Sequence, residues 1–214
     1  VERPAPWWQR RREQLLRIGT EHDSAFVYDG SVIREAARNL KALKSVDRLF
    51  FAMKSNPHPG ILQLVAAAGV DIECVSRGEI ERALEAVPGL ARERILFTPN
   101  FAARDEYAWA FTQGVHVTID NLYVLRHWPE LFRGREVLVR IDSGIGRGHH
   151  QHVRTAGTHS KFGIPVEELQ ELQTLVQSAG VRVVGLHAHP GSGVFDVNSW
   201  ADTASVLLAE APRF

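Results

Sequence analysis

Three features are scarce in this chain: net charge, cysteine and long apolar runs. Its 25 lysines and arginines balance its 25 aspartates and glutamates, so no net charge favours nucleic acid or an anionic membrane as a partner. No apolar run reaches the length of a membrane span, and the N-terminal segment lacks the apolar core of a signal peptide. The single cysteine, Cys74, excludes an internal disulfide and is typical of a reducing compartment. We therefore expect a cytoplasmic protein that binds neither membranes nor nucleic acid.

Apolar strand patterns alternate with helical patterns over most of the chain. Strands are predicted at 49–53, 70–75, 94–98, 115–119, 137–142 and 181–187. Helices are predicted from Ser31, as N-cap, to residue 43, and at 59–68, 78–87, 102–112, 121–132, 165–179 and 199–210. Such alternation of buried strands and helices indicates a parallel α/β fold. Because no glycine-rich dinucleotide fingerprint follows the first strand, a barrel is favoured over a Rossmann fold.

The strand count falls short of a closed barrel, which needs eight strands. The pattern supplies six, so we expect residues 30–214 to form about six of the eight units of a (β/α)8 barrel from a longer enzyme. The open sheet would leave two parallel edges unpaired. Ahead of the barrel, residues 22–29 (HDSAFVYD) have the pattern of a short strand that ends in a turn at Asp29-Gly30.

Lys54 closes the first predicted strand, in the stretch Phe50-Phe51-Ala52-Met53-Lys54-Ser55-Asn56, before prolines break the chain. In α/β barrels the carboxyl ends of the strands form the reaction face. Apolar neighbours would desolvate the ammonium group, and a neutral amine can form a Schiff base with an aldehyde. The alternative is an ordinary surface lysine at a strand terminus.

Two ordered sequence motifs resemble those of the fold type III pyridoxal-phosphate decarboxylases. The first is F-A-M-K-S-N-P around Lys54, and the second is G-V-D-I-E-C-V-S-R-G-E-I over residues 69–80. The residues of these motifs are most similar to those of diaminopimelate decarboxylases, particularly those fused to aspartate kinase. The resemblance implies the N-terminal half of a TIM barrel of the alanine racemase type that binds pyridoxal 5′-phosphate. It assigns residues 1–29 to a separate β-domain that is completed by a distant C-terminus.

The resemblance also implies an activity and an assembly. The expected reaction is decarboxylation of the amino acid meso-diaminopimelate to L-lysine, the last step of lysine biosynthesis, by a homodimer. Alternatives are a decarboxylase for ornithine, arginine or lysine, and a non-catalytic pyridoxal-phosphate-binding barrel. The family's G-G-G phosphate loop, the acid that pairs with the pyridine nitrogen and the C-E-S motif have no counterpart in this sequence. We therefore expect residues 1–214 alone to have little decarboxylase activity.

Five residues are assigned to the cofactor through this resemblance. Lys54 would hold the cofactor covalently, and Glu73 stands where the family usually has an aspartate. Arg140 ends the apolar run Val137-Leu138-Val139 and matches the family's L-L-R-I motif. His189 would stack on the pyridine ring and Ser192 would contact the phosphate, because G-L-H-A-H-P-G-S matches the family's G-L-H-x-H-x-G-S. Taken without the resemblance, Glu73 could be a strand residue that faces solvent, and Arg140 a salt-bridged residue at a strand end.

The remaining polar strand ends and loops are less specific. His187 and His189 could instead be a metal pair, but no further ligands occur at the other strand ends in a recognisable spacing, so no metal site is predicted. The glycine- and histidine-rich loop 143–163 ends in a family-like S-K-F-G and is expected to be a mobile, solvated segment. Thr98-Pro99-Asn100 and Thr118-Ile119-Asp120 are expected to line the pocket only.

Overall fold

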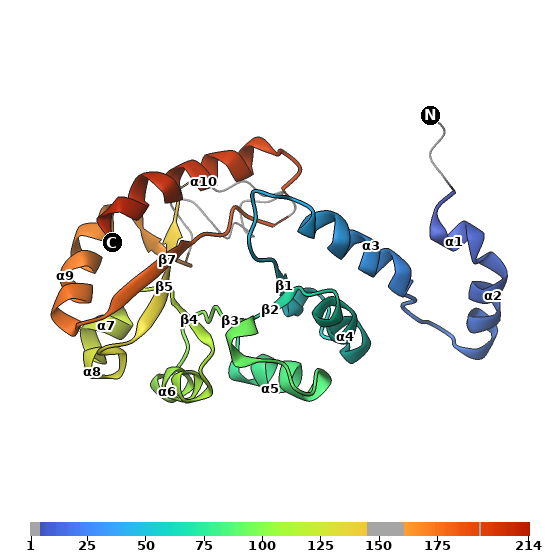
Figure 1. Cartoon of the computed structure of the whole chain (residues 1–214), viewed down its shortest axis with the longest axis horizontal. Coiled ribbons are helices and arrows are strands. Elements are labelled where there is room, and N and C mark those ends of the chain that lie inside the picture. The colour runs from blue at the N-terminus through green and yellow to red at the C-terminus, as the bar shows by residue number, and fades with distance from the viewer. Residues whose placement is uncertain (1–4, 145–160, 193) are drawn as a thin grey trace.

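The computed structural model describes residues 5–144, 161–192 and 194–214 (Figure 1). Its strands are β1 (Phe50–Ala52), β2 (Asp71–Cys74), β3 (Ile95–Phe97), β4 (His116–Ile119), β5 (Glu136–Asp142), β6 (Ile164–Pro165) and β7 (Arg182–His187). Its helices are α1 (Trp7–Arg10), α2 (Arg12–Glu21), α3 (Gly30–Lys41), α4 (Pro59–Ala67), α5 (Arg77–Ala86), α6 (Arg104–Gln113), α7 (Tyr123–His127), α8 (Pro129–Phe132), α9 (Leu169–Ala179) and α10 (Asn198–Glu210).

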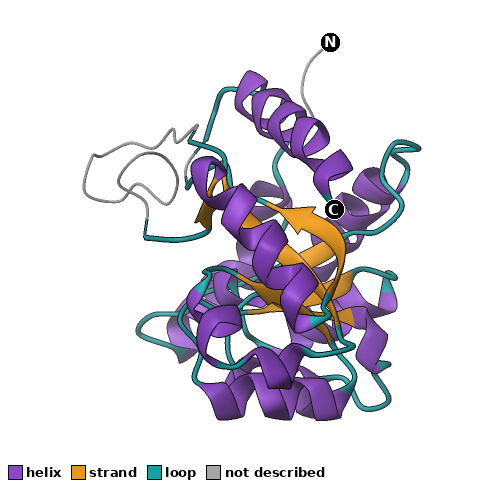
Figure 2. Ribbon diagram, turned by 90° about the vertical axis from the view of Figure 1, so that its left-hand side faces the viewer, coloured by secondary structure: helices purple, strands orange, loops and turns teal. Residues whose placement is uncertain are grey.

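The strands form one parallel sheet that curves into part of a barrel. Strands β1 to β5 pair in chain order, and the long strand β5 then takes two partners. Its amino-terminal part pairs with β7, and its last two residues pair with β6. Figure 1 shows the helices from α4 to α9 along the outer side of the strands, and Figure 2 shows α10 beside the sheet. The expected partial (β/α)8 barrel is therefore confirmed.

The six predicted strands are all present, with ends shifted by at most one residue. Three details of the prediction are wrong. The predicted helix 121–132 is two short helices, because the backbone leaves the helical conformation at Trp128, before Pro129. Strand β6 was not predicted, since two residues carry no periodic pattern. The N-cap of α3 is Asp29 instead of Ser31, and its carboxylate accepts a hydrogen bond from the Ser31 nitrogen at 2.8 Å.

The strand predicted at residues 22–29 is also wrong for this chain, because the segment pairs with no other strand in the described part. A strand needs a neighbour for its backbone groups, and Phe26 here is 91% exposed. Figure 1 shows α1 and α2 at a distance from the sheet, on the far side of α3. The assignment of residues 1–29 to a β-domain stays a prediction.

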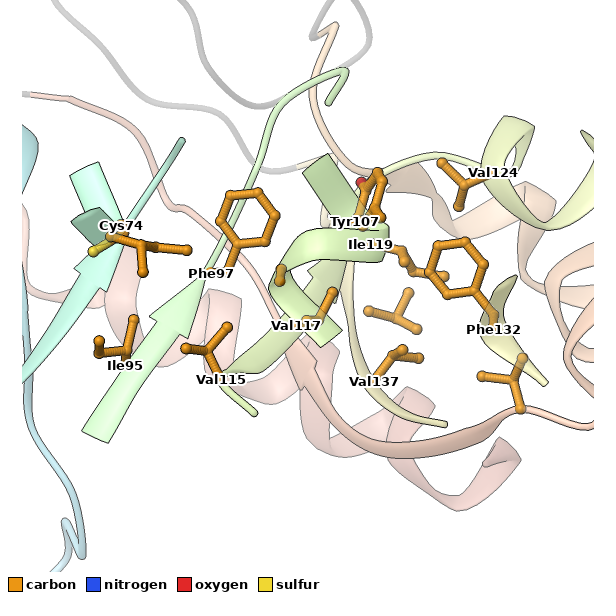
Figure 3. Close-up of a cluster of buried hydrophobic side chains, with 14 of the residues drawn as sticks. Cys74, Ile95, Phe97, Tyr107, Val115, Val117, Ile119, Val124, Phe132 and Val137 are labelled. Atoms are coloured by element: carbon orange, nitrogen blue, oxygen red, sulfur yellow. The ribbon is translucent and has the colours of Figure 1, made fainter. Parts of the chain in front are cut away.

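The main core lies between the sheet and the outer helices (Figure 3). Val137, Val139 and Ile141 of β5 are buried in it, and Tyr107 of α6 contacts Phe132 edge to face with ring centroids 5.4 Å apart. Side chains alternate along a strand, so Arg140 points to the opposite, concave side of the sheet. The fold therefore buries apolar residues under the helices and directs polar residues of the same strands to the barrel interior.

None of the helices in the described ranges is both long enough and apolar enough to cross a bilayer.

Candidate active site

Lys54 lies directly beyond β1, in the one-turn 3-10 helix Met53–Ser55. The buried Met53 side chain anchors this turn, and the Ser55 hydroxyl donates a hydrogen bond to the Ala52 carbonyl at 2.7 Å. The predicted position at the carboxyl end of a strand is thus confirmed. The expected desolvation is wrong in this structure, because Lys54 is exposed.

Glu73 faces the barrel interior from β2, between Ala52 of β1 and Leu96 of β3 in the strand register. Its carboxylate accepts a hydrogen bond from the hydroxyl of Thr98, the residue that follows β3. Partial burial raises the pKa of Glu73, and this hydrogen bond and the positive charges of Lys54 and Arg140 oppose the rise. The interpretation of Glu73 as a strand residue facing open solvent is therefore wrong.

Arg140 is buried, with 8% of its surface exposed, and its guanidinium donates to the Asn100 side-chain oxygen at 3.0 Å. The guanidinium carbon also lies over the Phe162 ring, 5.1 Å from its centroid. Burial lowers the pKa of Arg140, and the carboxylates of Asp120 and Glu73 counter this effect. The Asn100 amide oxygen thus serves as an acceptor for this buried guanidinium.

Two further candidate residues, His187 and His189, lie at the end of β7 and directly after it. Burial, followed by the positive charge of Arg140, lowers the pKa of His187 to about 3 and that of His189 to about 4. Both imidazoles are therefore neutral near pH 7. The Nδ1 atom of His187 is buried without a hydrogen-bond partner among the described residues. Lys54 adds to the lowering of both pKa values, so the structure brings the two histidines near Lys54 and Arg140.

Ser192 is exposed in the segment after β7, next to Gly191 with φ +125°. Gly193 lies outside the described residues, as do the three histidines of the loop, His149, His150 and His152. In the described part of the chain, no three His, Cys, Asp or Glu side chains gather in a way that could hold a metal ion.

Part of the second sequence motif has a structural role. Ser76 is the N-cap of α5, and its hydroxyl accepts a hydrogen bond from the Glu79 nitrogen at 3.2 Å. The Glu79 carboxylate in turn accepts from the Val75 nitrogen at 2.8 Å. This arrangement closely resembles a capping box, so Ser76 and Glu79 fix the start of the helix that follows Glu73.

Three residues that the sequence placed only in the pocket lining contact the predicted charges or face them. Thr98 and Asn100 bind Glu73 and Arg140, and Asp120 is 2% exposed with one carboxylate oxygen unpaired among the described residues. Burial raises the pKa of Asp120, and the charge of Arg140 opposes this. The sequence could have indicated these residues, because each is a polar residue directly after a buried strand, where the reaction face of a barrel is expected.

The parallel strand arc and its carboxyl-end cluster of lysine, carboxylates, arginine and neutral histidines define an α/β barrel domain with a strand-end site. The family profile described as "Pyridoxal-dependent decarboxylase, pyridoxal binding domain" matches residues 29–209. The chain belongs to this family.

Similar proteins point the same way. The chain is 33% identical over 193 residues to a diaminopimelate decarboxylase of Methanothermobacter thermautotrophicus, covering 88% of this chain and 45% of the relative. It is 35% identical over 184 residues to one of Streptomyces coelicolor, covering 85% and 41%. A crystal structure of a diaminopimelate decarboxylase superposes with TM-score 0.80 and 32% identity, covering 94% and 47%. The chain thus spans about half the length of the relatives it matches.

Proposed function

We propose that this chain is the cofactor-binding half of an enzyme that decarboxylates meso-diaminopimelate to L-lysine. The observation that carries the proposal is the placement of Lys54 at a strand end near Glu73, Arg140 and His189. The relatives named as diaminopimelate decarboxylases, at 33% and 35% identity, support this substrate.

The residues present fit pyridoxal phosphate. Lys54 offers an exposed primary amine for the aldehyde, and His189 offers a neutral, half-buried imidazole for the ring face. The barrel interior beside them is polar, with Thr98, Thr118 and Arg140 all buried there, whereas barrel interiors are usually filled by apolar layers. The unpaired Nδ1 atom of His187 is a further polar atom at this end of the barrel.

Each residue then has a stated task. Lys54 would hold the cofactor through Nζ, and His189 would contact its ring. Glu73 and Arg140 supply a negative and a positive charge on the concave side of the sheet, and Ser192 with the backbone beside Gly191 would contact the phosphate. When bound, pyridoxal phosphate supplies an aldehyde for the substrate amine and a ring that accepts the electrons released when carbon dioxide leaves.

The test is an assay of the full-length protein with diaminopimelate, ornithine, arginine and lysine. The proposal predicts carbon dioxide release from diaminopimelate with the highest kcat/KM and lysine as the product. A higher kcat/KM for ornithine, arginine or lysine would overturn the proposed substrate and leave the proposed decarboxylation reaction in place. Cofactor binding without carbon dioxide release from any of the four would indicate a non-catalytic pyridoxal-phosphate-binding barrel.

We further propose that the full-length protein is a cytoplasmic homodimer and that residues 1–29 belong to its second, β-type domain. The single cysteine, Cys74, is buried and unpaired, which is compatible with a reducing compartment. Light scattering of the purified full-length protein tests the dimer, and a monomer at assay concentration would contradict it.

A further inference from the structure

The connection from β3 to α6 reaches two of the proposed cofactor residues that lie on different strands. Thr98, 3% exposed, donates its hydroxyl hydrogen to Glu73 on β2. Two residues on, Asn100 accepts a hydrogen bond from Arg140 on β5. A single short connection thus contacts a carboxylate on one side and a guanidinium on the other.

Glu73 and Arg140 stand on β2 and β5, which β3 and β4 separate, and no ion pair joins them among the described residues. Both side chains are long, and each loses conformational freedom when it is held in one position. The hydrogen bonds from Thr98 and Asn100 hold the charged end of each side chain in place.

Two features restrict the backbone of this connection. Pro99, between the two polar residues, has a ring-restricted φ. Phe101, directly after Asn100, is the only non-glycine residue with positive φ (56°) in the described part of the chain. Such a conformation costs energy and persists only where the surroundings impose it. The Phe101 ring lies 6.1 Å from the Phe162 ring, and Phe162 also lies against the guanidinium of Arg140.

We propose that Thr98 and Asn100 are positioning residues that fix the side chains of Glu73 and Arg140, so that both charges remain directed toward the ligand at Lys54. This inference rests on the proposed function.

The test measures the dissociation constant of pyridoxal phosphate across pH, from its absorbance in the full-length protein. Thr98→Val removes the hydroxyl with little change of volume. Loss of this hydrogen bond to a charged acceptor should weaken pyridoxal phosphate binding by about tenfold. It should also raise the midpoint of the curve of binding against pH by about one unit, because Glu73 becomes harder to ionise. Thr98→Ser keeps the hydroxyl and should restore the wild-type midpoint.

Thr112→Val is the control. Thr112 lies near the end of α6, before the amino end of β4, and its hydroxyl donates a hydrogen bond to the Trp109 carbonyl at 2.6 Å. Its replacement should leave the pH midpoint in place. In a double-mutant cycle, Thr98→Val should have little further effect on the binding constant once Glu73 is replaced by Gln.

The Arg140 side of the connection is tested in the same way. Asn100→Leu removes the acceptor and should weaken pyridoxal phosphate binding by about tenfold, whereas Asn100→Asp keeps an acceptor oxygen and should retain most of the affinity.

The outcomes separate the two proposals. If the wild-type protein binds the cofactor, either of two results overturns the positioning role alone. One is an equal shift in Thr98→Val and Thr112→Val, and the other is an undiminished Thr98 effect in the Glu73→Gln background. A wild-type protein that does not bind the cofactor overturns the proposed function and the positioning role together.

Discussion

Asp71 stands at the amino end of β2, and its removal is expected to cost more stability than any exposed ion pair of this chain. Asp71 is 8% exposed, and its carboxylate accepts hydrogen bonds from two guanidinium groups. Arg94 Nε lies 2.7 Å from one oxygen, and Arg48 Nη2 and Nε lie 2.6 and 3.0 Å from the other. The same arginines bind the carbonyl oxygens of Glu93 and Val70, so the network joins β2 to the segments before β1 and β3.

The size of the effect follows from burial. Breaking a fully buried ion pair costs about 3–5 kcal/mol, because the remaining charge is left uncompensated. Here the Arg94 and Arg48 side chains are 31% and 44% exposed, so water screens part of that cost. We therefore expect Asp71→Asn, which keeps the shape of the side chain, to lower the free energy of unfolding by about 2–3 kcal/mol.

Urea unfolding of the full-length protein, followed by circular dichroism, measures this change. Glu81→Ala is the control, because the Arg77–Glu81 pair is about half exposed on both sides and should contribute less than about 1 kcal/mol. Arg94→Leu should also cost less in the Asp71→Asn background than in the wild type. Equal destabilisation by Asp71→Asn and Glu81→Ala would refute the reasoning.

Three further predictions concern the backbone, a helix cap and a histidine. Gly163→Ala should destabilise the protein by more than about 2 kcal/mol, because φ is +84° and an added Cβ would lie 2.7 Å from a main-chain nitrogen of β5. Gly134 has φ +68°, and an added Cβ there would meet no atom within 4 Å, so Gly134→Ala should cost only about 1 kcal/mol in the same urea experiment. Ser76→Ala should cost about 1 kcal/mol through loss of the α5 cap, whereas Ser76→Asp should keep most of the stability. The pKa of His187 is lowered from 6.5 to about 3, so between these pH values the unfolded chain binds a proton that the folded chain does not, and stability falls as the pH falls. His187→Leu should therefore flatten the dependence of unfolding free energy on pH between 6.5 and 4. An unchanged slope would contradict the burial of the neutral ring.

Local sequence patterns were sufficient for six of the seven strands in the described part of the chain and for most helices. Strands such as 137–142 are apolar because both faces of a parallel sheet are covered, so their position is encoded in the residues themselves. The cap of α3 was misassigned because Asp29 and Ser31 are both good capping residues, and only backbone geometry decides between them. Helix 121–132 was predicted whole because its apolar spacing continues past the break at Trp128.

The contacts among the candidate site residues were not predictable from the sequence. Glu73, Arg140 and His189 were assigned through the family resemblance, and their roles stay predictions. The contact of Thr98 with Glu73 depends on how far one side chain reaches across the sheet, which no pattern within a single strand encodes. The exposure of Lys54 was missed for a related reason, because the chain leaves β1 through a 3-10 turn.

The most direct test of the central claim is to identify the lysine that holds the cofactor. The full-length protein is incubated with pyridoxal phosphate, reduced with borohydride, digested and analysed by mass spectrometry. We expect the added mass on the peptide that contains Lys54, its loss in Lys54→Ala and its retention in Lys44→Ala. Labelling of Lys41, Lys44 or Lys161 in place of Lys54 would contradict it.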